Sequence, residues 1–160
     1  AQESRGLGDV YKRQIMSRAR DNANLVGQTL QTVNASTTTQ TNPSSSSYVQ
    51  VSGLTVTLTP RQSTNKVLVT AHIGYYSPTP SNGALAIYRN GSLISEYGYY
   101  QYQGGEFNYT AISFLDSPTT TSSVTYSIYA KAPNGVVWYI NYVDGGGQVK
   151  SSITAMEIAA

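Results

Sequence analysis

The side chains that could perform catalysis are few and scattered. The chain has one histidine, His72, no cysteine and eight acidic residues among 160. A hydrolase or transferase needs an activated nucleophile, an acid–base pair or a metal ion. No two acidic residues stand at the i, i+2 spacing that places two carboxylates on one face of a strand. We therefore expect no catalytic residue, no metal site and no cofactor.

Two acidic residues occur next to turn signals, and each admits two interpretations. Asp116 begins an Asp-Ser-Pro turn, where its side chain can bond backbone N–H groups, and this role is favoured over catalysis or metal binding. Asp144 precedes three glycines in a weak likeness of a calcium loop. It lacks nearby acidic partners, so a flexible turn is favoured.

Tyrosine is the one residue type that stands above background, with 14 residues against one tryptophan and two phenylalanines. Four lie close together: Tyr97, Tyr99, Tyr100 and Tyr102. Their rings are candidates for ligand binding, and the alternative is that they cover a sheet edge or line a subunit interface. The only charged residues nearby are Glu96 and Glu106, so a neutral sugar is favoured over nucleic acid as the ligand.

The charge distribution separates the first 20 residues from the rest. Residues 1–20 hold five basic and two acidic side chains, whereas residues 21–160 hold five basic and six acidic ones. The main part of the chain therefore lacks the basic surface that nucleic-acid binding requires. No stretch approaches the ~20 apolar residues of a membrane span, so we expect neither nucleic acid nor a membrane as a partner.

Alternating apolar and polar residues recur along most of the chain, separated by turn residues, and predict an all-β antiparallel sandwich of two sheets. A glycine bulge is expected at Ser52-Gly53, where the inward set shifts from Val49 and Val51 to Leu54, and a tight hairpin at Asn90-Gly91. About nine or ten strands are expected, and the segments that show the pattern are residues 30–36, 48–59, 66–76, 83–88, 92–97, 108–116, 123–132, 136–142 and 151–158.

Two of these strands carry no charge on the face that should meet water. Residues 109–115 are apolar or neutral on both faces, and the last strand is similar, since Ile153 and Ala155 oppose Thr154, Met156 and Ile158. A strand that is apolar on both faces is covered on both, and the second cover is most simply another subunit. The predicted subunit interface contains Tyr109, Ala111, Ser113, Leu115, Met156 and Ile158.

Four segments carry a family resemblance: YVQVSGLTVTLTP (48–60), NKVLV (65–69), ISFLDSP (112–118) and SSITAMEI (151–158). They resemble the head domains of phage tail-fibre and related virion proteins, which are similar to the tumour-necrosis-factor-like jelly roll. The resemblance implies a ten-stranded jelly-roll sandwich that assembles as a threefold trimer. Residues 97–107 depart from the family pattern.

The resemblance also implies a function and a division of the chain. Residues 9–14, DVYKRQ, resemble the translated end of a sequencing-library adaptor, so residues 1–14 are interpreted as a non-native leader. Residues 15–27 are interpreted as a short stalk, helical over 15–25, and residues 28–160 as the head. Such a head lies on the virion surface, joined to an upstream fibre or capsid component, and binds a host-surface polysaccharide or protein. The alternative is a structural capsid decoration or fibre cap without a host ligand.

Overall fold

The structure of the 160-residue chain is a computed structural model that describes residues 9–16, 26–102, 104–144 and 147–160. The side chains of residues 99–102, 143, 144, 147 and 148 are outside the description. Residues 9–16 form a short helix. This helix begins earlier than the one predicted over 15–25. Residues 15 and 16 are common to both, and the rest of the predicted helix, residues 17–25, lies outside the described residues.

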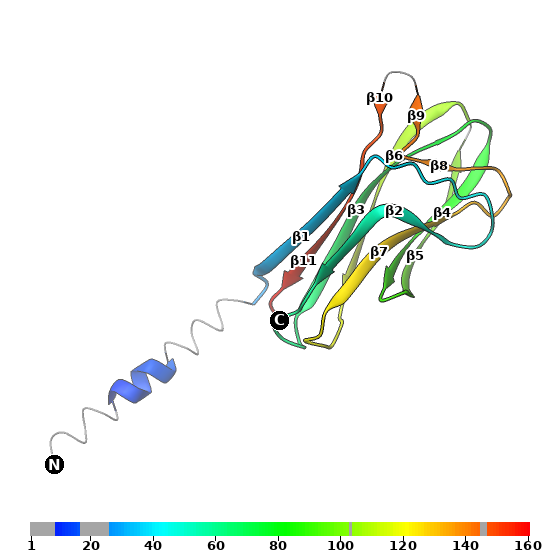
Figure 1. Ribbon diagram of the computed structural model, residues 1–160. Coiled ribbons are helices and arrows are strands. Elements are labelled where there is room, and N and C mark those ends of the chain that lie inside the picture. Colours follow the sequence, from blue (N-terminus) through cyan, green and yellow to red (C-terminus); the bar gives the residue numbers. More distant parts are fainter. Residues whose placement is uncertain (1–8, 17–25, 103, 145–146) are drawn as a thin grey trace, which may run out of the picture.

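All the long strands belong to two antiparallel sheets, which Figure 1 shows as two facing layers. The first sheet has the order β1 (Thr29–Thr37), β11 (Ser151–Ile158), β3 (Lys66–Ser77) and β6 (Glu106–Asp116), with the short β8 (Tyr139–Ile140) paired to β3. The second has the order β2 (Val49–Leu58), β7 (Val124–Lys131), β4 (Ser81–Arg89) and β5 (Ser92–Tyr102). A separate hairpin joins β9 (Val143–Asp144) to β10 (Gly147–Gln148).

The period-two pattern of the sequence builds the core between the layers. Val67, Val69, Ala71 and Ile73 of β3 are all buried, as the alternation predicted. They pack in one apolar cluster with inward residues of both sheets, including Leu85, Ile87 and Ile128. The all-β antiparallel sandwich is therefore confirmed, with eight strands of eight residues or more and three of two residues among those described.

The two predicted backbone devices are both present. The register of β2 against β7 shifts between Gln50 and Thr55, and Gly53 has φ +77°, so an extra residue moves the inward positions from Val51 to Leu54. Val49 was also expected inside, but at the start of β2, ahead of the bulge, it is exposed. Asn90 and Gly91 both have positive φ in the β4–β5 hairpin, as predicted.

The strand predicted over residues 136–142 is wrong for most of its length. Only Tyr139 and Ile140 are in a strand, and Asn141 has φ +57°, which interrupts an extended chain. Trp138 is fully buried, and its ring lies 4.6 Å from that of Tyr75 and directly over Gly83. The segment therefore follows a path that inserts the indole into the end of the core.

Candidate functional site

The six residues of the predicted subunit interface all lie on the outer face of the first sheet. Tyr109 is 65% exposed and Leu115 is 53% exposed, while Ala111 and Ser113 are also exposed. Met156 and Ile158 are half-buried on β11, two strands away. The structure therefore brings these residues onto one surface, whereas their role as an interface stays a prediction.

The strand register arranges this surface in rows. One row contains Leu115, Leu68, Met156 and Thr32, taken across β6, β3, β11 and β1. The next two rows contain only neutral residues apart from His72, which opposes Ala111 and Ser152. Across the outward-facing positions of these four strands there is no acidic residue, and only Lys66 and His72 carry basic groups. The outer face of the first sheet is broad, flat and almost without charge.

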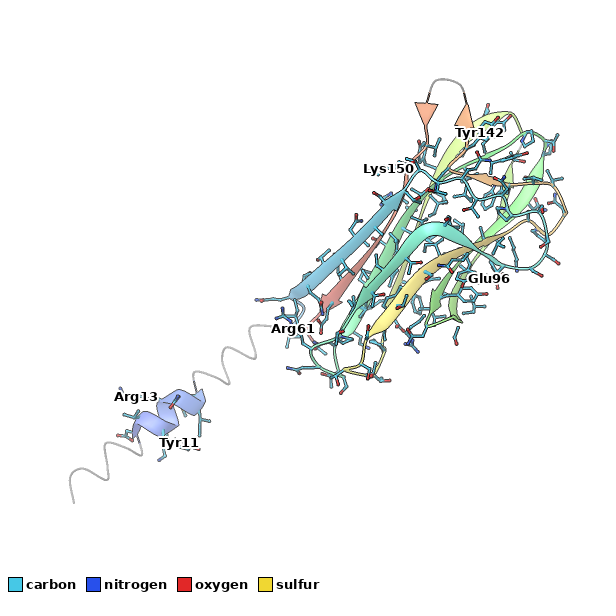
Figure 2. All side chains as sticks on the ribbon, in the orientation of Figure 1. Tyr11, Arg13, Arg61, Glu96, Tyr142 and Lys150 are labelled. Atoms are coloured by element: carbon cyan, nitrogen blue, oxygen red, sulfur yellow. The ribbon has the colours of Figure 1, made fainter. Side chains whose placement is uncertain are left out.

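Four aromatic rings close one end of this face. Tyr76 stacks on Tyr142 with ring centroids 4.6 Å apart and lies 5.1 Å from Phe107, and Tyr139 lies 5.2 Å from Tyr142. Figure 2 shows Tyr142 at the end of the sandwich near β9 and β10, far from Arg61. The ring of Tyr109 lies next to this cluster over Gly74, where a Cβ would come within 2.9 Å of it.

The tyrosines singled out from the sequence are only partly described. Tyr97 is half-buried, packs against the core, and donates a hydrogen bond of 2.5 Å from its hydroxyl to the carbonyl oxygen of Ser113. Because Tyr97 is in β5 and Ser113 in β6, this bond joins the edges of the two sheets. The side chains of Tyr99, Tyr100 and Tyr102 lie outside the described residues. Ligand binding by this group stays a prediction.

A second aromatic group lies on the outer face of the second sheet. Tyr88 and Tyr129 stack with centroids 3.9 Å apart, and Tyr48 meets Tyr88 edge-on at 6.0 Å. The Lys131 ammonium lies 4.4 Å from the centre of the Tyr48 ring and forms an ion pair of 2.8 Å with Glu96. We call these five residues the tyrosine–ion-pair site.

Electrostatics within this site keep Glu96 ionised. The hydrogen bond from Lys131 lowers the pKa of the Glu96 carboxyl below its ordinary value, and a hydrogen bond with Tyr48 lowers it further. The Lys131 side chain is 14% exposed, whereas that of Glu96 is 42% exposed. The carboxylate is therefore the accessible half of the pair.

Asp116 has a different role from the one predicted. It is buried, accepts two hydrogen bonds from the Arg89 guanidinium at 2.8 and 2.9 Å, and accepts one from the Tyr126 hydroxyl at 2.7 Å. Burial, together with this hydrogen bond to a carboxylate, raises the pKa of Tyr126. The interpretation of Asp116 as a turn residue missed these contacts, because its partners come from two other strands, β4 and β7, of the opposite sheet.

No protein-family model and no curated protein matches the chain. Among solved structures, it is similar to latent PorU from Porphyromonas gingivalis, with 10% identity and a TM-score of 0.45 over 84% of this chain and 13% of that one. It is also similar to the T13 viral particle of infectious bursal disease virus, with 10% identity and a TM-score of 0.47 over 81% and 36%. A third similarity is to the C-terminal domain of EclA, a sugar-binding protein, with 14% identity and a TM-score of 0.37 over 77% and 78%.

The chain thus spans well under half the length of the first two of these proteins. At such low identities and TM-scores, the likenesses carry no argument about function. Two further findings concern the described residues alone: they include no group of three or more His, Cys, Asp or Glu side chains placed to hold a metal ion, and no helix long and apolar enough to cross a membrane.

Sequence reasoning missed both aromatic groups. The rings of the second group, Tyr48, Tyr88 and Tyr129, are about 40 residues apart along the chain. The rings beside Tyr76 likewise come from other segments of the chain. The one available signal was the outward parity of Tyr129 and Lys131 in the same strand as the inward Ile128 and Ala130. This alternation identifies the face of the sheet on which Tyr129 and Lys131 lie, but not the residues of neighbouring strands that they contact.

Proposed function

We propose that this chain is a non-catalytic attachment head on a virion surface, assembled as a homotrimer and directed at a host-surface glycan or protein. The observation that carries the proposal is the outer face of the first sheet, whose described positions include no acidic residue and only Lys66 and His72 as basic ones. An antiparallel sheet that faces water normally presents polar and charged residues there. Here the exposed positions include Phe107, Tyr109 and Leu115, and the rows between them carry neutral side chains apart from His72.

Two further copies of the chain are the proposed cover for this face. Large exposed apolar side chains that gather on one face of a soluble domain mark an interaction site, and closed assemblies of identical subunits are the commonest solution. The resemblance to trimeric jelly-roll heads supports the threefold arrangement. The strand orders β1-β11-β3-β6 and β2-β7-β4-β5 support a jelly-roll path, because the first and last strands are neighbours in one sheet.

The placement of the ionisable groups supports a binding role over catalysis. His72 is exposed on the flat outer face, between the neutral residues Ala111 and Ser152. Among the described residues, the buried carboxylates are those of Asp116 and Glu157, and donors from several strands and loops engage them. Neither His72 nor these two carboxylates resemble the acid–base pair that a polysaccharide-cleaving head would need.

The trimer is tested by two matched leucine substitutions. Leu115, 53% exposed on the first sheet, and Leu93, 47% exposed on the second, are similar in size and exposure. Leu115→Glu places an unpaired carboxylate in the proposed interface, which costs several kcal/mol per subunit at an order-of-magnitude level. Leu93→Glu places the same charge on the opposite side of the sandwich.

Sedimentation or light scattering of the purified protein gives the result. We expect the parent and Leu93→Glu to have the mass of three chains, and Leu115→Glu to have the mass of one chain with unchanged circular dichroism. A folded parent that is monomeric at ~50 µM contradicts the proposal. So does a trimer that both substitutions leave intact.

A further inference from the structure

We infer that the tyrosine–ion-pair site on the second sheet binds a neutral sugar. The inference rests on the proposed function, because it names a ligand class and a location for the attachment head. The site lies on the outer face of the second sheet, and the proposed subunit contacts use the outer face of the first. Assembly therefore leaves it open to solvent on every subunit.

The side chains of the site are held in place by the sheet beneath them. In the strand register Tyr129 and Glu96 flank Ala86 from opposite sides, and Lys131 stands beside Ala84. Both alanines share the outward side of β4 with these residues, yet both are fully buried. The longer side chains thus lie over β4 instead of extending freely, so that binding orders them at a smaller entropic cost.

The rings supply the apolar half of the recognition. Tyr48, Tyr88 and Tyr129 are all half-buried, so each keeps part of its ring surface at the solvent boundary. The stacked pair and the edge-on third ring form one continuous aromatic surface. The carbon–hydrogen face of a sugar ring packs on such a surface, which removes apolar area from water.

The polar half comes from groups at the border of the rings. Glu96 offers ionised carboxylate oxygens as acceptors for sugar hydroxyl groups. Gln50 is exposed, and its Oε1 atom lies 3.4 Å from the Tyr129 hydroxyl. An aromatic surface with an amide on one side and a carboxylate on the other matches a ring that has one apolar face and hydroxyl groups at its edge.

The charges select a neutral ligand over an anionic one. Lys131 is the only basic residue at the outward positions of the described parts of β2, β4, β5 and β7, and Glu96 compensates its charge. A phosphate, sulfate or uronate group would meet an exposed carboxylate before it met the ammonium. Anionic polysaccharide and nucleic acid are therefore disfavoured, since both depend on uncompensated cations.

The test is gel mobility of the assembled parent protein in native gels that contain dextran, mannan, galactan or heparin. Tyr129→Thr removes a ring but keeps a strand-favouring residue, and Glu96→Gln keeps the shape of the acceptor but removes its charge. Tyr142→Thr is the control, since it removes a tyrosine ring from the separate aromatic group around Tyr76. Thermal melting confirms that each variant is folded.

We expect at least one of the three neutral polysaccharides to retard the parent. Tyr129→Thr and Glu96→Gln should weaken that interaction about tenfold, while Tyr142→Thr stays within about twofold of the parent. The inference is overturned if no neutral polysaccharide retards the parent, if Tyr129→Thr binds normally, or if heparin binds more tightly than the neutral polymers.

The mass of the same samples separates this inference from the proposed function. A trimer that no neutral polysaccharide retards refutes the sugar site and leaves the assembly supported. A monomer whose retardation depends on Tyr129 and Glu96 supports the site and refutes the trimer.

Discussion

Glu157 offers the sharpest test of what holds the sandwich together. Its carboxylate is fully buried in β11. One oxygen accepts hydrogen bonds of 2.6 Å from the Asn65 amide and from the backbone N–H of Arg61, and the other accepts one of 2.5 Å from the Gln31 amide. These donors belong to β1 and to the loop between β2 and β3. Figure 2 shows Arg61 at the end of the sandwich where β1 begins.

The informative change is Glu157→Gln, which keeps the shape and replaces one acceptor oxygen by a donor. Depending on how the new amide at position 157 is oriented, its N–H group points either at the Gln31 amide or at the donors from Asn65 and Arg61. A hydrogen bond to a charged group contributes ~1.5–3 kcal/mol, so the free energy of unfolding should fall by about 2–3 kcal/mol. At about 3 °C per kcal/mol for a domain of this size, the melting temperature at pH 7 falls by roughly 6–9 °C.

The pH dependence gives the same prediction a second, independent readout. Burial alone would raise the pKa of Glu157, but the hydrogen bonds from Asn65, Gln31 and Arg61 outweigh it and lower the pKa below the ordinary value of 4.5. A carboxyl with a lowered pKa in the folded state stabilises the fold above pH 4.5 and loses this effect as the pH falls through the folded-state pKa. The stability difference between parent and Glu157→Gln should therefore shrink in acid.

A rescue variant and a control complete the experiment. Adding Gln31→Glu to Glu157→Gln restores an acceptor opposite the new amide and should recover part of the lost stability, although Thr59 loses the hydrogen bond that Gln31 donates to it. The control is Glu106→Gln, which removes an exposed carboxylate. If Glu157→Gln melts within 2 °C of the parent at pH 7, the assignment of these hydrogen bonds as stabilising is wrong.

Two smaller perturbations test the junctions between the sheets. Tyr97→Phe removes the hydroxyl that donates to Ser113, and we expect a loss of ~0.5–1.5 kcal/mol in urea unfolding. An unchanged midpoint would show that this edge bond contributes nothing. Gly83→Ala places a methyl group 2.5 Å from the fully buried Trp138 ring, so overpacking should cost ~1–3 kcal/mol and shift the tryptophan fluorescence. Parent-like stability and emission would contradict that contact.

The strands were predictable because their determinants are local. In β3 four alternate positions are buried, and the same alternation is visible in the sequence before any pairing is known. The hairpin at Asn90-Gly91 followed from two residues that tolerate positive φ. The bulge at Gly53 followed from a change of parity in one strand. None of these inferences needed a contact between distant segments.

The features that the sequence did not reveal depend on tertiary partners. Residues 136–142 have the composition of a strand, but the indole of Trp138 packs over Gly83 and beside Tyr75, and only Tyr139 and Ile140 of this segment pair with β3. Glu157 looks like the polar position of an alternating strand. It is buried because donors from Gln31 and Asn65, both more than 90 residues away, make burial of its charge possible.

The tyrosines illustrate why density along a chain is a poor guide to a surface in a β-sandwich. Successive residues of a strand point to opposite faces, so a run of neighbouring tyrosines is divided between two surfaces, whereas residues from adjacent strands in register share one. Tyr97 follows this rule, since it points toward the core from the strand in which Glu96 faces outward. The ring surface that accompanies Glu96 is supplied by Tyr48, Tyr88 and Tyr129 of other strand regions. A search for recognition surfaces in such chains should therefore begin from the cross-strand register.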